Sequence, residues 1–265
     1  MLGPSRPDND FPYWLVALGA LVAWMMWKVI ADDLYIQIAG TLSRGIRITV
    51  LVTVIGFASA ATIGLLLAVL SMSRSLILRQ IARFYIEIMR GVPIIVLLLY
   101  VAFVMAPVLV DLVNWVLEPF GAERWRSRDF PLLWRATLAL ALGYSAFIAE
   151  IFRAGLQSVD EGQIEAAEAL GMNRFQRFRL IVFPQAIRTI LPPLGNDFIA
   201  MVKDSSLVSV LGVADITQLG KVTAAGNFRY FETYNIVALI YLILTVALSL
   251  GLRRLERYLR EQPRS

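Results

Sequence analysis

The sequence has no cysteine and no histidine among its 265 residues. Without cysteine the chain forms no disulfide and offers no thiolate as a nucleophile or metal ligand. Without histidine it lacks the commonest general base and the commonest metal ligand. These two absences argue against a metal site on this chain and against an enzyme that depends on either residue type.

Charged residues are also scarce. They make up 17% of the chain, whereas hydrophobic residues make up 58%, and a soluble domain carries about 25% charged residues. The composition therefore predicts an integral membrane protein surrounded by lipid, and its long apolar runs indicate helices because barrel strands would alternate. A net charge of +5 is small for a nucleic-acid-binding protein, and Lys and Arg in cytoplasmic loops explain it more simply.

The apolar runs predict an all-α membrane protein with about six transmembrane helices. Each run of about 20 residues gives about 30 Å of helix, which is the thickness of a hydrocarbon core. A secretory signal is an alternative for the first run, with Val29-Ile30-Ala31 as cleavage site, but Asp8, Asp10 and bulky aromatic residues argue against it. The six expected spans are 11–31, 48–70, 91–110, 136–149 with the residues that follow it, 189–211 and 234–252.

The distribution of basic residues predicts that both termini lie inside the cell. Of the 25 Lys and Arg residues, 15 fall in the segments that this arrangement places inside and 9 in those it places outside, while Lys203 falls within a span. The segment 71–90 is placed inside by its four arginines, whereas 32–47, 111–135 and 212–233 are expected to be external connections.

The longest polar segment with a helical pattern is 160–188. Asp160 is a good helix N-cap with Gln163 three residues later, and Asn173 with Gln176 repeats the pattern. Between them Gly171 stands where a helix requires a left-handed residue, and Pro184 is expected to kink or end the second helix. The segment therefore predicts a compact helix–turn–helix elbow, although an ordinary amphipathic helix on the membrane surface is an alternative.

The motif within this elbow resembles the EAA loop of ATP-binding-cassette (ABC) importer permeases, in the subfamily that takes up polar amino acids. Its residues are Glu165, Ala166, Ala167, Gly171, Ile181 and Pro184. The resemblance covers about 42–260 and is carried by the runs 84–100, 144–159, 161–172, 183–199 and 203–216. It implies a five-helix permease domain at 42–260 with its coupling loop at 160–188, preceded by a tail at 1–10 and an extra helix at 11–31, and followed by a tail at 261–265.

The resemblance also implies partners. A second permease subunit, the same chain or a homologous one, would complete the pathway in a bacterial inner membrane. A cytoplasmic ABC ATPase dimer would bind the elbows as coupling helices, and an extracytoplasmic binding protein would deliver the amino acid. The chain has no G-x-x-x-x-G-K-[ST] loop to hold phosphates, so ATP and magnesium are expected on the partner ATPase, with no cofactor on this chain.

The span 189–211 is interrupted by polar residues, which would be costly against lipid and are typical of a pathway lining. An amino acid offers one carboxylate and one ammonium, so groups of both charges would suit it. An alternative is that Lys203 and Asp204 pair with neighbours and only hold the bundle together. The candidate pathway residues are Asn196, Asp197, Lys203, Asp204, Ser205 and Ser206.

Two other functions fit the composition less well. A secondary transporter driven by an ion gradient would explain charges within a span but would not explain the elbow. A membrane-embedded enzyme would need a clustered nucleophile and base, which the sequence does not offer. The carboxylates Glu150, Asp160, Glu161, Glu165 and Glu168 are close in sequence, but without His or Cys they indicate a solvated helix face more than a metal or acid–base site.

Overall fold

A computed structural model describes residues 13–121 and 123–261 of the chain. Across these ranges the regular structure is helical throughout, which confirms the expected all-α membrane protein. Five of the described helical segments are long and apolar enough to cross a membrane. The expected tail 1–10 and the last four residues of the chain lie outside the described residues. The five segments are Tyr13–Ala31, Asp33–Ser71, Ile94–Phe120, Leu132–Gln157 and Tyr230–Tyr258.

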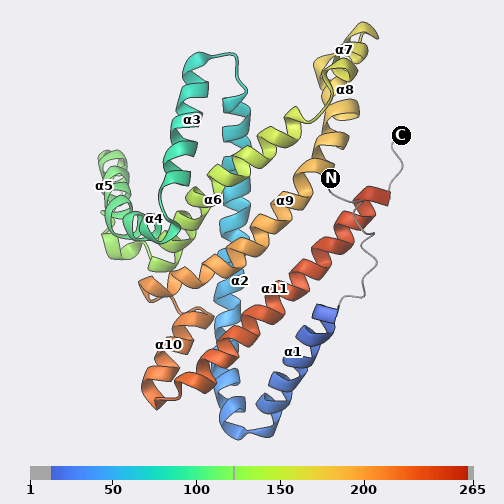
Figure 1. The fold of residues 1–265 in the computed structure, drawn as a ribbon. Coiled ribbons are helices and arrows are strands. Elements are labelled where there is room, and N and C mark those ends of the chain that lie inside the picture. Colours follow the sequence, from blue (N-terminus) through green and yellow to red (C-terminus); the bar gives the residue numbers. More distant parts are fainter. Residues whose placement is uncertain (1–12, 122, 262–265) are drawn as a thin grey trace.

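The helices form an elongated bundle (Figure 1). The turn between the first two helices and α10 lie at one end, whereas α7, α8 and the turn between α2 and α3 lie at the other. Short π-helical turns at Val101–Met105 and Phe178–Val182 join neighbouring α-helices. The α-helices are α1 (Tyr13–Ala31), α2 (Asp33–Ser71), α3 (Leu76–Gly91), α4 (Ile94–Tyr100), α5 (Ala106–Leu117), α6 (Leu132–Gln157), α7 (Glu161–Ala169), α8 (Arg174–Arg177), α9 (Phe183–Asp204), α10 (Ile216–Asn227) and α11 (Tyr230–Glu261).

Helix α2 is longer than the sequence suggests. It has 39 residues, about 58 Å of helix, and it absorbs nearly all of the segment 32–47 that was expected to be a polar connection. Its first turns bury one stripe at helical spacing, whereas the polar residues that obscured the pattern, such as Arg44 and Arg47, lie on the exposed side. The buried stripe is Tyr35, Ile38, Leu42, Gly45 and Thr49.

Helices α2 and α6 form the centre of the bundle. Most of α6 is buried, and small residues allow the two backbones to approach closely. A Cβ atom added to Gly64 of α2 would lie 2.9 Å from the carbonyl oxygen of Ser145 and 2.9 Å from Ile148 Cγ2. Glycine is therefore required at position 64 by packing.

The fifth expected span, 189–211, corresponds to most of α9 and the 3₁₀ segment Ser205–Leu211. The connections differ more from expectation. Residues 71–90 are mostly α3, and 212–233 contains α10. The helical path that begins in 91–110 continues through α4, the π-helical turn and α5 to Leu117. Short helices in connections bury few side chains, so their apolar pattern is weak in the sequence.

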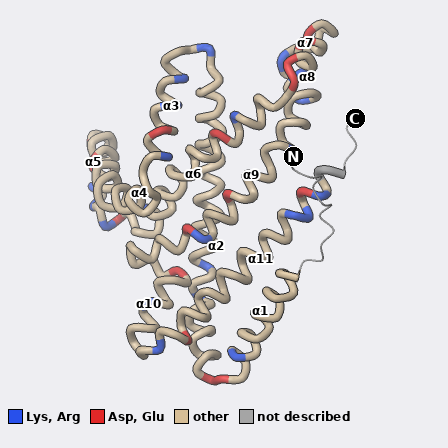
Figure 2. The backbone as a smooth tube through the Cα atoms, viewed as in Figure 1, with Lys and Arg blue, Asp and Glu red and all other residues tan. Residues whose placement is uncertain are grey.

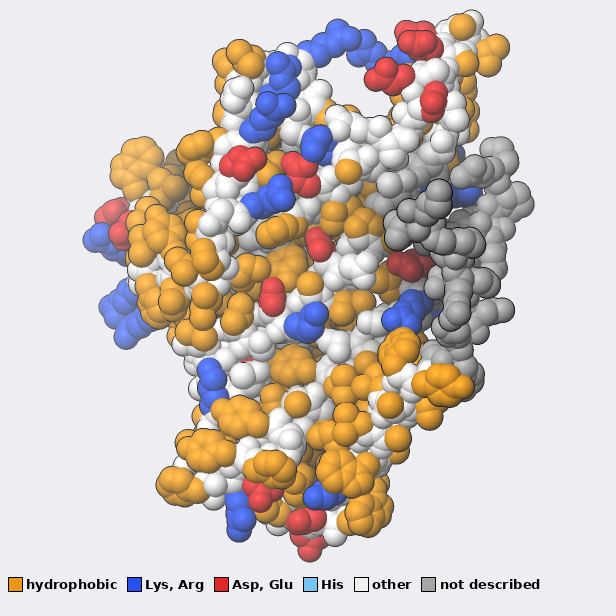
Figure 3. Space-filling view, viewed as in Figure 1, with side chains coloured by type: hydrophobic (Ala, Val, Ile, Leu, Met, Phe, Trp, Pro, Cys, Tyr) orange, Lys and Arg blue, Asp and Glu red, His pale blue; other side chains and the backbone are white. Residues whose placement is uncertain are grey.

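Charged residues are distributed unevenly along the bundle. Acidic and basic positions occur partway along α9, within the body of the bundle (Figure 2). Hydrophobic side chains cover most of the face shown in Figure 3, and acidic side chains gather at the tip formed around α7. The orientation with both termini inside stays a prediction.

Candidate functional site: the elbow and the polar helix

The elbow begins with α7, whose start is fixed by its N-cap. The Asp160 carboxylate accepts a hydrogen bond from the Gln163 amide at 3.3 Å, as its position predicted. Along α7, Ala167 is buried and Ile164 packs against a small core with Val159, Ala186 and Ile190 at its centre. The opposite side of α7 is left exposed.

A tight turn follows α7. Gly171 has φ +77°, a left-handed conformation that an L side chain adopts only with strain. The Gly171 amide donates to the Glu168 carbonyl at 2.9 Å, and the Met172 amide donates to the Ala167 carbonyl at 3.1 Å. This pair of bonds is a Schellman motif, so the glycine is required by the backbone of the turn.

The second half of the elbow is fixed in the same way. The Gln176 amide donates to the Asn173 side chain at 3.0 Å, and the Asn173 amide donates to the Gln176 side chain at 2.9 Å, which confirms the predicted capping box. Arg177 forms an ion pair with Glu168 across the turn at 2.7 Å. The two short helices are therefore joined by side chains as well as by the chain.

The elbow is also tied to α9. The Gln185 amide group donates to the Gln163 side chain at 2.7 Å. Helix α8, the π-helical turn and α9 follow one another without a break from Arg174 to Asp204. The structure corrects one part of the expectation for Pro184: the helix does not end there. Pro184 lies in the first turn of α9, where a missing amide is tolerated, and the π-helical turn before it shifts the hydrogen-bond register. A kink at this proline stays a prediction.

The six motif residues divide into three pairs. Glu165 and Ala166 are exposed on α7; Ala167 is buried and Ile181 half-buried beneath it; Gly171 and Pro184 shape the backbone. The sequence interpretation missed the apolar tip. Leu170 is 82% exposed and Phe175 is 68% exposed, which is unusual for large apolar side chains in a segment this polar.

Two of the five acidic residues in and before the elbow pair with arginines. Glu168 pairs with Arg177, and Glu150 pairs with Arg153 at 2.5 Å. Across the described ranges no group of three His, Cys, Asp or Glu side chains is arranged to hold a metal ion.

The candidate pathway residues lie on and just after the last turns of α9, but they do not form one cluster. Asn196 and Lys203, seven residues apart, share one side of the helix and are exposed, whereas Asp197 and Asp204 share the neighbouring side and are half-buried. Ser205 is buried, and its hydroxyl donates to the Val202 carbonyl at 2.7 Å.

The two aspartates of α9 differ in their partners. Asp204 accepts a hydrogen bond from the Tyr144 hydroxyl of α6 at 2.8 Å. Asp197 has one carboxylate oxygen, Oδ2, that is buried without a hydrogen-bond partner, and such atoms are rare in folded proteins. Among the described residues Lys203 has no carboxylate within 4.0 Å. Asp204 therefore has a neighbouring partner, Tyr144, whereas Lys203 has no acidic partner among these residues. The pathway role of both residues stays a prediction.

Comparison with known proteins finds relatives that align with this chain over nearly the whole of their own length. The glutamine transport system permease protein GlnP of Escherichia coli (strain K12) is 38% identical over 216 residues, which cover 82% of this chain and 91% of GlnP. The probable amino-acid permease protein YxeN of Bacillus subtilis (strain 168) is 38% identical over 210 residues, covering 79% of this chain and 87% of YxeN.

Solved structures agree with this similarity. A crystal structure of an amino acid ABC transporter with histidines aligns with a TM-score of 0.72 and 36% identity, over 86% of this chain and 98% of that one. The inward-facing MetNI methionine ABC transporter aligns with a TM-score of 0.62 and 21% identity, over 83% of this chain and 96% of that one, which supports the fold.

The family profile described as the binding-protein-dependent transport system inner membrane component matches residues 60–262. The match includes α6, the elbow and all of α9. The chain therefore belongs to the family of inner membrane components of binding-protein-dependent transport systems.

Proposed function

We propose that this chain is the permease subunit of an ABC importer that moves a polar amino acid into the cytoplasm of a bacterium. The observation that carries the proposal is the unbroken helical path from the elbow tip to the polar part of α9. A partner that pushed on the elbow would move Asp197, Lys203 and Asp204 with it. The relatives named for glutamine and amino-acid transport support the substrate class.

The elbow is the proposed docking site for a cytoplasmic ATPase. Exposed apolar residues at its tip, Leu170 and Phe175, would be buried in the interface, and the neighbouring Glu165 would make polar contacts at its rim. Because Gly171 has no side chain, the backbone of the turn can itself come close to the ATPase surface. The ATPase binds ATP and magnesium. In the proposed orientation, this end of the bundle and both termini lie inside the cell.

The candidate pathway groups suit a zwitterionic substrate. Lys203 would attract a carboxylate, and Asp197 and Asp204 would attract an ammonium group. Asn196, Ser205 and Ser206 complete the proposed set, with Ser205 supporting the backbone at the end of α9. A second permease subunit would cover the exposed side of α9, and a binding protein would deliver the amino acid from outside.

Reconstitution tests this function. Proteoliposomes that contain the chain with its ATPase and binding protein should accumulate radiolabelled glutamine or another polar amino acid only when ATP is enclosed. The control omits the ATPase and imposes a proton or sodium gradient. Uptake that is driven by the gradient and needs no ATPase would show a secondary transporter and would overturn the proposal.

The Gly171→Asp substitution tests the elbow. The chain should still insert in the membrane, but the ATPase should no longer co-purify and uptake should be lost, because a side chain now projects from the turn at the interface. Gly121→Asp is the matched control, since Gly121 also has a positive φ of +78° and, like Gly171, has nothing within 4 Å of an added Cβ atom. Equal ATPase retention and uptake in the two variants would show that the elbow is not part of the ATPase interface.

A further inference from the structure

Two separate cavities lie one after the other along α1 and α11, and we call them together the crevice. The cavity near the α1–α2 turn has a volume of about 180 Å³, and the one farther along the same two helices has about 490 Å³. The α1 residues that line them extend from Leu15 to Val29, about 21 Å of helix. Half of a hydrocarbon core is about 15 Å thick, so the crevice is long enough for one extended acyl chain.

The walls of the crevice are apolar except at one end. The second cavity is lined without any charged residue, by Leu18, Val22, Ile243 and Val246 among others. Helix α1 has no buried residue, so the crevice lies at the periphery of the bundle, where lipid has access.

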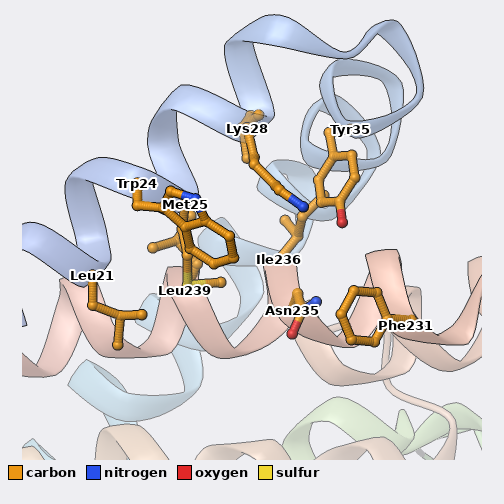
Figure 4. A pocket seen from close by; sticks show the side chains of 10 residues that line it. Leu21, Trp24, Met25, Lys28, Tyr35, Phe231, Asn235, Ile236 and Leu239 are labelled. Carbon is orange, nitrogen blue, oxygen red and sulfur yellow. The ribbon is translucent and has the colours of Figure 1, made fainter.

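The end nearest the α1–α2 turn is different. Figure 4 shows the tips of Lys28 and Tyr35 near each other and extending toward α11, from which Asn235 also lines this end, whereas Leu21 and Leu239 line the apolar side. These groups supply an ammonium, a hydroxyl and an amide, all of which can donate hydrogen bonds.

No acidic residue lines this end of the crevice. The Lys28 ammonium lies 5.0 Å from the centre of the Trp24 ring and, in the part of the chain that the structure describes, has no carboxylate within 4.0 Å. The nearest acids along the chain, Asp32 and Asp33, belong to the turn and the start of α2. The polar end therefore favours an anion.

We propose that this crevice binds one membrane phospholipid. Its phosphodiester lies between Lys28, Tyr35 and Asn235, and one acyl chain follows Leu21 and Leu239 into the apolar part. Charge complementarity at one end, and apolar cavities behind it that together span the length of an acyl chain, identify this occupant. A lipid bound here would join α1 to the rest of the permease at a place where the two helices otherwise leave space.

Native mass spectrometry of the full chain, purified in mild detergent and stripped of lipid, tests the proposal. Phosphatidylglycerol and phosphatidylethanolamine should both bind, and a diacylglycerol with the same chains should bind much more weakly because it lacks the phosphate. Lys28→Gln should weaken phosphatidylglycerol binding about fivefold, the usual contribution of one basic residue near an anionic headgroup. Arg44→Gln, which removes an exposed cation from the first part of α2, is the matched control and should bind as the unaltered chain does.

A second variant tests the apolar part. An added Cβ atom at Gly19 meets nothing within 4 Å, so Gly19→Leu should fold and fill the crevice, which should reduce the binding of both phospholipids. Gly40→Leu, at an equally open position on α2, should not. Phospholipid binding that is unchanged in both Lys28→Gln and Gly19→Leu, or diacylglycerol binding as strong as phospholipid binding, would overturn the proposal.

A helix of another chain is the alternative occupant, and it can be tested by cross-linking because the chain has no native cysteine. In a Val22→Cys variant, disulfide cross-linking of α1 to a second copy in native membranes would show that protein fills the crevice and would contradict the lipid assignment. A monomeric product under the same oxidation agrees with it.

Discussion

Replacing Tyr144 with Phe removes one hydroxyl and keeps the ring. The substitution therefore separates a role of Tyr144 in positioning Asp204 from its role in packing. The Tyr144 hydroxyl donates to Asp204 at 2.8 Å and links α6 to α9. A hydrogen bond to a charged group contributes about 1.5 to 3 kcal/mol. Because Asp204 is half-buried, we take the lower end of that range, which corresponds to roughly a tenfold effect on an equilibrium constant.

The assay is ATP-dependent amino-acid uptake measured over a range of substrate concentrations. If Tyr144 holds Asp204 in place for the substrate ammonium group, Tyr144→Phe should raise KM about tenfold with little change in the maximal rate. Asp204→Asn should raise KM at least as much. The double variant should be no worse than Asp204→Asn alone, because both changes act through the same bond.

Tyr85→Phe is the matched control. The Tyr85 hydroxyl of α3 donates to the Leu142 carbonyl of α6 at 3.0 Å and lies 2.9 Å from the Ser145 hydroxyl. Tyr85→Phe therefore also removes a tyrosine hydrogen bond to α6, but one that does not involve α9. It should lower thermal stability without changing KM. Equal KM values for Tyr144→Phe and Tyr85→Phe, or additive effects in the double variant, would refute the positioning role.

Three further substitutions test the fold and the elbow. Gly64→Leu should destabilise the α2–α6 contact by about 1 to 3 kcal/mol or more because the side chain meets backbone at Ser145; a denaturation midpoint equal to that of Gly19→Leu would contradict this. Arg177→Gln should leave thermal stability within about 1 kcal/mol, since Glu168 is largely exposed, but should weaken ATPase retention; unchanged retention would show that the ion pair does not hold the elbow in shape. Burial raises the pKa of Asp215 above its ordinary value, against the opposing effect of the Gln218 amide bond. The folded state therefore binds the Asp215 proton more tightly than the unfolded state does, so thermal stability should fall as pH rises from the ordinary carboxyl pKa through the raised pKa. Asp215→Asn should lose that part of the pH dependence. A variant whose thermal stability depends on pH as the unaltered chain's does would contradict the raised pKa.

Much of the fold is readable from the sequence because lipid imposes a simple rule. Uncharged runs of sufficient length become spans, and 48–70 and 234–252 lie within α2 and α11 as expected. The rule fails where a helix continues beyond the apolar run. Arg44 and Arg47 made the start of α2 resemble a loop, but its buried stripe packs against α10 and α11 as a helix. The approach is closest at Gly45, where an added Cβ atom would lie 2.5 Å from the Ile216 amide nitrogen.

The elbow was predictable because its signals are local. Asp160, Gly171 and Asn173 act on backbone groups a few residues away, so spacing alone indicates the caps and the turn. What surrounds the elbow was not predictable. The exposure of Leu170 and Phe175 and the bond from Tyr144 to Asp204 depend on contacts between segments far apart in the sequence.

The central claim is that the elbow and α9 move as one body when the ATPase binds ATP. Spin labels at two exposed positions outside the motif and the candidate pathway set, Glu161→Cys in α7 and Thr189→Cys in α9, measure this directly, because the chain has no native cysteine. In the reconstituted complex, the distance between these labels should be the same with and without ATP, whereas the distance from Glu161→Cys to Gly40→Cys on α2 should change. A 161–189 distance that changes on ATP binding, with the 161–40 distance constant, would contradict the account.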